Sequence, residues 1–219
     1  DNIYIIKGSG VNLKKFKHTK LPNTLPLIIF PSRMLIDKGF YEFINAAKIV
    51  NKNKILAEFI LAGSHDPDNP KSISMATLNS FNGVNGIKWI GYVENIENLF
   101  EKSSIVVLPS YQEGLPKSLQ DAAAIGRAII TTNTNGCREV VDNNINGYLV
   151  PVYDYKLIAD KINFLLKNKN ILIEMGKKSR LKAEKEFDET LIVDKHLIIY
   201  KNFRNEKKTK YSYNWIRRI

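Results

Sequence analysis

Two carboxylates flank a short turn in the stretch "EGLPKSLQD" (113–121), where Glu113 precedes Gly-Leu-Pro and Asp121 stands eight positions later. The apolar run "IVVLPS" comes just before this stretch and is typical of a buried strand. Proline is favoured at the first position of a helix because its missing N–H is not needed there. We therefore predict that a helix begins at Pro116, directly after the turn.

A helix start of this kind suits a phosphorylated ligand. The first N–H groups of a helix have no helical partner, and the helix dipole favours negative charge beside them. The amides of Leu115, Lys117 and Ser118 are the expected donors, and the two carboxylates are suited to holding sugar hydroxyls. The competing interpretation is that Glu113 only caps the helix and that Asp121 is solvated.

Arg33 and Lys38 follow the first apolar run, in "SRMLIDKG". Arginine offers a planar fork of donors and lysine a compact point charge, and together they suit a diphosphate. Alone, each is equally compatible with an ordinary surface charge. Because parallel strands carry their ligand-binding loops at one edge, we expect Arg33, Lys38 and Glu113 to face one crevice.

Apolar runs alternate with helical periodicity about six times along the chain. Strands are expected at 25–33, 55–63, 87–93, 104–110, 127–132 and 146–151. Helices are expected at 38–53, 71–81, 95–103, 116–126 and 136–142, with about three helical pieces after Pro151. This alternation predicts an α/β fold: a Rossmann-like, doubly wound parallel sheet of about six strands with helices on both faces and C-terminal helices.

Composition excludes several classes of protein. The chain has 219 residues, a net charge of +11 and a single cysteine, Cys137, which rules out an internal disulfide and a cysteine-based zinc cluster. The longest apolar runs are shorter than the ~20 residues of a membrane span. His18, His65 and His196 lack the spacing of metal ligands. These features favour a cytoplasmic protein.

The last nineteen residues, 201–219, carry seven basic residues and one acidic residue, a net +6, with four aromatic residues interleaved. This basic aromatic tail is compatible with an anionic membrane surface, with RNA or with a missing partner domain. A solvated chain end is an equally good explanation.

Several segments together resemble one family. "EGLPKSLQDA" is similar to the acid-x7-acid motif of the retaining nucleotide-sugar glycosyltransferases called group 1 or family 4, and "SRMLIDKG" looks like their Arg/Lys phosphate clamp. "GRAIITTNTNGCREVVDNNINGYLVP" resembles their closing strand–turn segment, and "GSGVNLKKF" the linker that opens their second domain. The resemblance covers roughly residues 5–190, with the motifs in the family's order.

The resemblance implies a GT-B fold, of which residues 1–200 would be the C-terminal, donor-binding domain and 201–219 a tail, with the N-terminal acceptor domain absent from this chain. It implies catalytic roles for Glu113, which would contact the transferred sugar, and for Arg33 and Lys38, which would neutralise the leaving diphosphate. Donor binding would involve Gly114, Leu115, Pro116, Lys117, Ser118, Asp121, Tyr92 and Val93. Asp121, where the family usually has Glu, would hold the ribose, and Tyr92 and Val93 would face the base.

The implied function is retaining transfer of a sugar, from UDP by family frequency, to a glycan or lipid-linked acceptor during synthesis of a surface polysaccharide or lipopolysaccharide. No metal, cofactor or nucleic acid is expected, and the place of action would be the cytoplasm, in particular the inner face of the plasma membrane. The alternative is a module that binds a nucleotide sugar or a nucleic acid and catalyses nothing.

Overall fold

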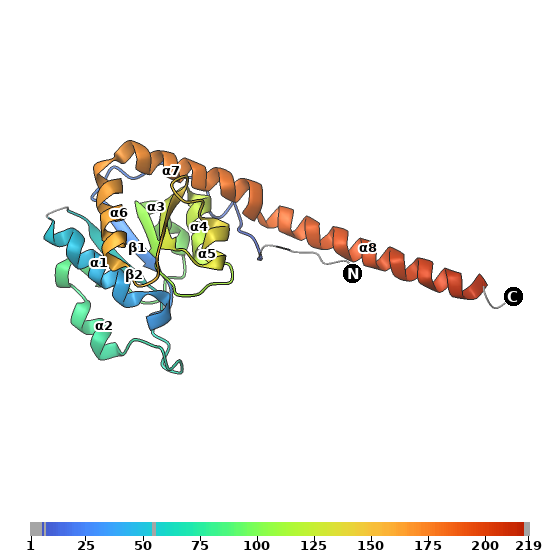
Figure 1. Ribbon diagram of the computed structural model, residues 1–219, viewed down its shortest axis with the longest axis horizontal. Helices are drawn as coiled ribbons and strands as arrows, with labels where there is room; N and C mark the ends of the chain where they lie inside the picture. The colour runs from blue at the N-terminus through green and yellow to red at the C-terminus, as the bar shows by residue number, and fades with distance from the viewer. Residues whose placement is uncertain (1–5, 7, 54–55, 217–219) are drawn as a thin grey trace.

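A six-stranded, all-parallel sheet forms the centre of the protein (Figure 1). The structure, a computed structural model, describes residue 6 and residues 8–53 and 56–216, with side chains as far as Phe203. The strand order is β3-β2-β1-β4-β5-β6. The strands are β1 (Leu27–Pro31), β2 (Glu58–Ala62), β3 (Ile87–Trp89), β4 (Ile105–Leu108), β5 (Ala128–Thr132) and β6 (Gly147–Val150).

Helices cover both faces of this sheet. They are α1 (Phe40–Lys52), α2 (Met75–Phe81), α3 (Ile96–Lys102), α4 (Lys117–Ile125), α5 (Asn135–Val140), α6 (Tyr155–Lys167), α7 (Lys169–Lys182) and α8 (Glu189–Ile216). Helix α1 packs against α6 on one face, and α4 packs against α7 on the other. The predicted fold class is confirmed.

The apolar pattern of the sequence explains why the sheet is buried on both faces. Every residue of β4 and β5 is buried, as continuous apolar strands require when helices lie above and below them. The face of α1 expected to be apolar lies in the core: Phe40, Phe43, Ile44, Ala47 and Val50 are all buried. Periodicity therefore predicted these elements correctly.

Most element ends differ from the predictions by one to four residues, and three of them have a clear local cause. Pro116 is the N-cap of α4, with extended backbone at ψ 115°, and the helix begins at Lys117. The helix expected from residue 71 begins only at Met75, because the Ser74 side chain caps it by accepting from the Thr77 amide. Strand β3 ends at Trp89, since the chain turns away at Gly91, whose φ is +71°.

The strand order has one topological switch point, between β1 and β4. From β1 the chain proceeds outward to β2 and β3, and it then returns to the other side of β1 as β4. At such a point the loops that follow the two central strands diverge and leave a crevice at the carboxyl edge of the sheet. The loops after β1 and β4 carry Lys38 and Glu113.

Helix α8 leaves the body of the domain and projects away from it (Figure 1). It follows a π-helical turn at Ala183–Phe187 and continues to Ile216. The residues 201–216 of the expected tail therefore belong to a helix that begins at Glu189, while residues 217–219 lie outside the described residues. The division between domain and tail at residue 200 stays a prediction. Among the described residues, no helix combines the length and apolar character needed to cross a membrane.

Candidate active site at the switch point

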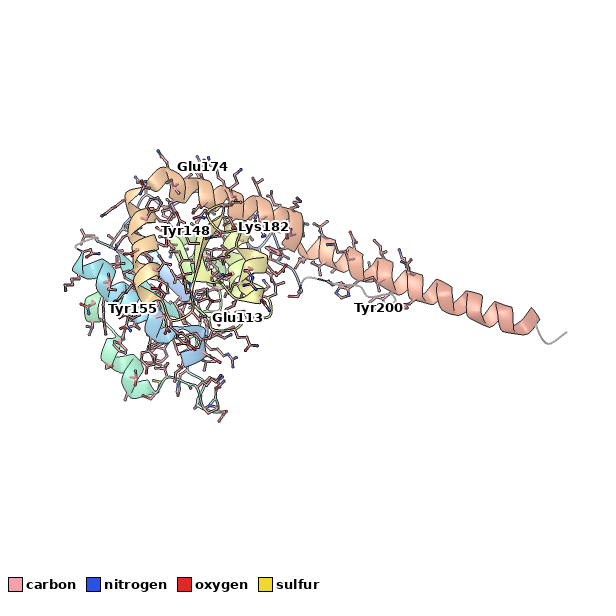
Figure 2. The ribbon with its side chains drawn as sticks, in the orientation of Figure 1. Glu113, Tyr148, Tyr155, Glu174, Lys182 and Tyr200 are labelled. Carbon is pink, nitrogen blue, oxygen red and sulfur yellow. The ribbon has the colours of Figure 1, made fainter. Side chains whose placement is uncertain are left out.

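Lys38 and Glu113 form an ion pair across the switch point. The Lys38 ammonium lies 2.7 Å from Oε1 of Glu113, and the two side chains are 21% and 13% exposed. Figure 2 shows Glu113 at the edge of the body on which the β4–α4 loop lies. The two residues are 75 positions apart, so the contact exists only because β1 and β4 are neighbours. The structure brings Lys38 and Glu113 together and pairs Arg33 with Asp66, and the expectation that all three groups line one donor crevice stays a prediction.

Gly39 brings the loop after β1 close to the end of β4. A Cβ at this position would lie 2.2 Å from the carbonyl oxygen of Pro109, and the φ of Gly39 is +82°. The carbonyl of Asp37 accepts hydrogen bonds from the Tyr111 amide at 2.9 Å and from the Ser110 hydroxyl at 3.1 Å. These contacts hold Lys38, next to Asp37, in reach of the acidic turn.

Gly136, in the first turn of α5, supports the turn that carries Glu113. A Cβ on Gly136 would lie 2.3 Å from the carbonyl oxygen of Gly114 and 2.5 Å from that of Glu113. The hydroxyl of Thr132, at the end of β5, donates to the Ser110 carbonyl. The turn is thus held from β5 and α5 as well as from the β1 loop. A glycine in a helical turn is visible in the sequence, but its contact with the Glu113–Gly114 turn is not.

The start of α4 presents backbone donors beside Glu113. The Pro116 carbonyl accepts the first helical hydrogen bonds, from the amides of Leu119 at 3.1 Å and Gln120 at 3.2 Å. The amides of Lys117 and Ser118 precede these bonds and have no carbonyl one turn earlier to bond with. Gly114 is exposed and Leu115 is partly buried. The predicted donor residues 114–118 therefore surround the helix start, and their role in binding stays a prediction.

Arg33 lies in the same loop as Lys38 but has a different partner. Its guanidinium donates to Oδ2 of Asp66 at 2.7 Å, and its side chain is 55% exposed. Asp66 follows β2, so this pair ties the loops after β1 and β2 together. The structure does not place Arg33 against Glu113.

The sequence contains an Asp-x-Asp pair, Asp66 and Asp68, so the expectation that no metal is needed was wrong to rest on the absence of such a pair. Asp66 is bound by Arg33. No group of three or more His, Cys, Asp or Glu residues that suits a metal ion occurs within the described ranges. The expectation that the reaction needs no metal stays a prediction.

Asp121 lies in the second turn of α4 and is buried. Its partner is Lys117, one turn earlier on the same helix. Burial raises the pKa of the Asp121 carboxyl above its usual value, and Lys117 opposes that rise. The carboxylate is thus held within α4 and not shared with another loop.

Tyr92 and Val93 lie in the open loop after β3. The Gly91 carbonyl accepts from the Gly63 amide at 2.8 Å, and the Trp89 indole donates to the Gly63 carbonyl at 2.9 Å. Tyr92 is 76% exposed, whereas Val93 packs against the core. The structure therefore places this loop at the same edge as the site, with the Tyr92 side chain in solvent.

Tyr111 is a residue that the sequence analysis did not single out. Its hydroxyl lies 3.0 Å from each carboxylate oxygen of Glu42, which is buried in the first turn of α1. Burial, followed by the bond to Glu42, raises the pKa of Tyr111 well above its usual range. The neutral phenol thus attaches the loop ahead of Glu113 to α1. An aromatic residue two positions before the motif was the only sign of this contact.

A parallel α/β sheet with helices on both faces and a single switch point defines the class of Rossmann-like domains, which bind their ligands at that point of the sheet. The chain belongs to the family "Glycosyl transferases group 1", whose sequence profile matches residues 11–186.

Two curated relatives and one solved structure place the chain within this family. The chain is 31% identical over 214 residues to the N,N'-diacetylbacillosaminyl-diphospho-undecaprenol alpha-1,3-N-acetylgalactosaminyltransferase of Campylobacter jejuni, covering 91% of this chain and 54% of that one. It is 26% identical over 212 residues to the capsular polysaccharide biosynthesis glycosyltransferase CapM of Staphylococcus aureus, covering 93% and 55%. The crystal structure of HepE from Anabaena in complex with UDP superposes with a TM-score of 0.77 at 16% identity, covering 88% and 56%, which shows the shared fold.

The chain spans about half the length of the curated relatives that it matches. Family membership and fold are therefore established for this half, and they agree with the resemblance found in the sequence motifs.

Proposed function

We propose that this chain is the donor-binding half of a glycosyltransferase that moves a sugar from a nucleotide diphosphate to a glycan or lipid-linked acceptor. The observation that carries the proposal is the Lys38–Glu113 pair at the switch point, next to the amide-bearing start of α4. A cation, a carboxylate and helix amides meet where a parallel sheet binds its ligands. Family membership supplies the reaction class.

Each group has a defined task in this proposal. When the bond between the sugar and the diphosphate breaks, negative charge grows on the leaving diphosphate. Lys38 and the amides of Lys117 and Ser118 stabilise that charge because they are already in place. The charge of Arg33 becomes available when the diphosphate replaces Asp66 as its partner. Glu113, displaced from Lys38 by the donor, holds the hydroxyls of the transferred sugar.

The remaining roles concern the nucleoside. Asp121 is proposed to hold the ribose, although its carboxylate is now paired with Lys117. Tyr92 and Val93 are proposed to face the base. We propose UDP as the nucleotide and retention of configuration at the sugar, without a metal. The UDP complex of the structural neighbour HepE supports the choice of UDP.

The acceptor is proposed from the relatives. The Campylobacter jejuni relative is named for an undecaprenol diphosphate acceptor, and CapM for capsular polysaccharide biosynthesis. We infer an acceptor of that kind here, used at the cytoplasmic face of the membrane in the assembly of a surface polysaccharide or lipopolysaccharide. An acceptor domain is proposed to complete the active site from the other side of the crevice.

The exposed side chains of helix α8 favour contact between this donor-binding domain and another surface. Large apolar side chains are exposed along its first three turns, and these are Leu191, Val193, Leu197, Ile198 and Tyr200. These side chains lie on two opposite sides of a projecting helix, and exposed apolar groups of this kind are suited to packing on protein or to contact with a membrane. We propose that α8 contacts the acceptor domain, with residues 201–219 directed toward the anionic bilayer.

Two measurements test the proposed function. Isothermal titration calorimetry of the 219-residue chain with UDP, GDP and ADP should show saturable binding, tightest for one base. No binding of any nucleoside diphosphate or nucleotide sugar at millimolar concentration would overturn the donor site. Transfer of labelled sugar to an undecaprenyl-diphosphate-linked acceptor by the full-length protein then separates an enzyme from a binding module without catalysis.

A further inference from the structure

A second hollow lies at the amino edge of the sheet, away from the candidate active site. It has a volume of about 390 Å³ and lies between the segment before β1, the end of α4 and the first half of α7. Figure 2 shows Glu174, on this half of α7, at the top of the body and Glu113 lower down, and none of the residues that line the cavity lies in the loops that carry Lys38 and Glu113. A ligand in this cavity would therefore not reach the Lys38–Glu113 pair.

The polar side chains at this cavity are predominantly cationic. Lys20, Lys169, Lys177 and His18 line it, and none of the described residues that line it is acidic. Lys169 donates to the side-chain oxygen of Asn23 at 3.0 Å, and Lys177 pairs with the exposed Glu174. Lys20 forms no ion pair with any described residue. Apolar side chains form the rest of the wall, and they are Leu21, Leu172 and Ile173.

The shape of the cavity depends on two glycines. Gly126, at the end of α4, has a φ of +86°, and a Cβ there would lie 2.4 Å from the His18 ring. A Cβ on Gly176 of α7 would lie 2.4 Å from the Gly126 carbonyl oxygen. These close approaches set the spacing between His18 and α7, so the cavity is a built feature of the fold and not a gap between mobile loops.

The charge around the cavity is positive even though α4 ends there. A helix carboxyl end carries partial negative charge on its last carbonyls. Here Arg180 donates to the Ala124 carbonyl at 2.7 Å, and Arg127 donates to the carbonyls of Ile125 and Gly126. Because the arginines bond these carbonyls, the partial negative charge at the end of α4 is offset. The electrostatic potential at the cavity then depends on the lysines and on the amino end of α7.

We propose that this cavity binds a phosphate-bearing molecule, with its phosphate between Lys20, Lys169 and Lys177 and an apolar part against Leu172 and Ile173. Lysines hold phosphate as point charges, and an apolar wall beside them favours a ligand that is not a bare inorganic ion. The ligand is either a free phosphate ester or the headgroup of an anionic lipid. This site is separate from the donor site and does not depend on the proposed function.

His18 provides a local reporter for this proposal. The His18 side chain is exposed, but partial desolvation lowers the pKa of its imidazole, and Arg180, Arg127 and Lys177 lower it further, while Glu184 acts in the opposite sense. A bound phosphate favours the protonated ring and raises that pKa. By linkage, phosphate binding tightens as the pH falls through the range in which the ring titrates.

The test follows the His18 ring by NMR in the 219-residue chain during titration with inorganic pyrophosphate, and separately with vesicles of phosphatidylglycerol and phosphatidylcholine. We expect a saturable shift of the His18 signal and a higher pKa. In the double variant Lys20→Ala/Lys177→Ala, affinity should fall by at least about tenfold, since two charge-assisted contacts are lost. The matched control Lys156→Ala/Lys185→Ala removes the same charge from exposed sites elsewhere and should bind within about twofold of the wild type.

The two arms identify the source of the phosphate. A change in the His18 signal with phosphatidylglycerol vesicles, which the double variant loses and the control keeps, assigns a lipid headgroup. Saturable pyrophosphate binding without vesicle binding assigns a free phosphate ester. A His18 signal unmoved by either probe at tens of millimolar pyrophosphate, or equal affinity in the wild type and the double variant, overturns the proposal. Thermal melts and UDP calorimetry of all variants show separately that the fold and the donor site are intact.

Discussion

Glu113 and Asp121 belong to one motif and are each paired with a lysine, yet the two pairs are built differently. Lys38 reaches Glu113 from the loop after β1, 75 positions away, whereas Lys117 reaches Asp121 from the previous turn of the same helix. Glu113 lies in a turn fixed by contacts from β5 and α5. The printed hydrogen-bond partner of Asp121 is Lys117 of the same helix, and Lys15 and Glu97 act on the carboxyl only through their charge.

This difference separates the tasks of the two carboxylates. An ion pair between two loops forms only when the fold brings the loops together. A ligand that binds between Lys38 and Glu113 must separate the two side chains. A pair within one helix forms wherever the helix forms, and such pairs contribute only about 0.2–0.5 kcal/mol at exposed sites. We therefore expect substitutions at the Glu113 turn to affect ligand chemistry, and substitutions at Asp121 to affect the stability of the domain in addition to the ribose contact proposed for it.

The largest effect is expected for Glu113→Ala in the full-length protein. Loss of the carboxylate that holds the transferred sugar should lower kcat by about 100-fold or more, the scale found when one preorganised polar group is removed from a site. Steady-state assays of sugar transfer measure this change. The variant Glu186→Ala, outside the crevice, serves as the control, and turnover near that of the wild type in Glu113→Ala would remove this residue from the site.

Gly136→Ala should have the next largest effect, because it displaces the turn without changing any charged group. The new methyl would lie within 2.5 Å of the carbonyl oxygens of Glu113 and Gly114. We expect a loss of about 1–3 kcal/mol in the free energy of unfolding, typical of overpacking. Transfer activity should fall with it at temperatures where the domain remains folded.

Urea denaturation and transfer assays of the same preparation test this prediction. Gly83→Ala is the matched control for chain entropy and exposure, because no atom lies within 4 Å of a Cβ built there, although its φ of +81° gives that variant a backbone cost of its own. Full activity in a destabilised Gly136→Ala protein would show that the turn tolerates displacement.

Lys38→Ala should weaken UDP or GDP binding by about tenfold, the equivalent of one charge-assisted hydrogen bond. Arg33→Ala should weaken it less, because Arg33 must first leave Asp66 and its side chain is more exposed. Calorimetry of the 219-residue chain gives both affinities. Lys88→Ala, which removes a surface ion pair with Glu58, controls for net charge. Unchanged affinity in Lys38→Ala would contradict the diphosphate clamp.

The fold was largely predictable from the sequence, because the core strands are short apolar runs and each helix buries one face. Phe40, Phe43 and Val50 show this most simply: their spacing alone places them on the buried face of α1. Element ends were less predictable, since Pro116 and Ser74 both precede helices and only the local backbone decides which residue is the cap.

The site was predictable in part. Parallel topology was enough to bring Lys38 and Glu113 to one edge, because that conclusion needs only the strand order. The partners of individual side chains were not predictable. Arg33 bonds Asp66 in another loop, and Tyr111 bonds Glu42 in α1, and both contacts depend on loop paths that the local sequence does not determine. The basic cavity at the opposite edge also escaped prediction, since its lysines come from segments about 150 residues apart.

Asp121→Asn should have the smallest effect on the free energy of unfolding. It tests the Lys117–Asp121 pair within α4 through the pH dependence of stability. Burial raises the pKa of Asp121 in the folded chain above the ordinary value of 3.8. Between pH 3.8 and the raised pKa of the folded state, the folded chain binds more protons than the unfolded chain. The free energy of unfolding therefore falls as the pH rises through that range. Asparagine does not titrate and lacks this loss.

The free energy of unfolding of the wild type minus that of Asp121→Asn should therefore decrease as the pH rises from about 4, and should level off once Asp121 is ionised in the folded state. Urea denaturation at a series of pH values measures this difference, with the exposed Asp160→Asn on α6 as the control for charge. A difference that instead grows with pH would mean that the Lys117 contact outweighs the cost of burial. Asp121 would then stabilise the fold through its ion pair with Lys117, and measurements of nucleotide binding and transfer would have to separate its role from that of Glu113.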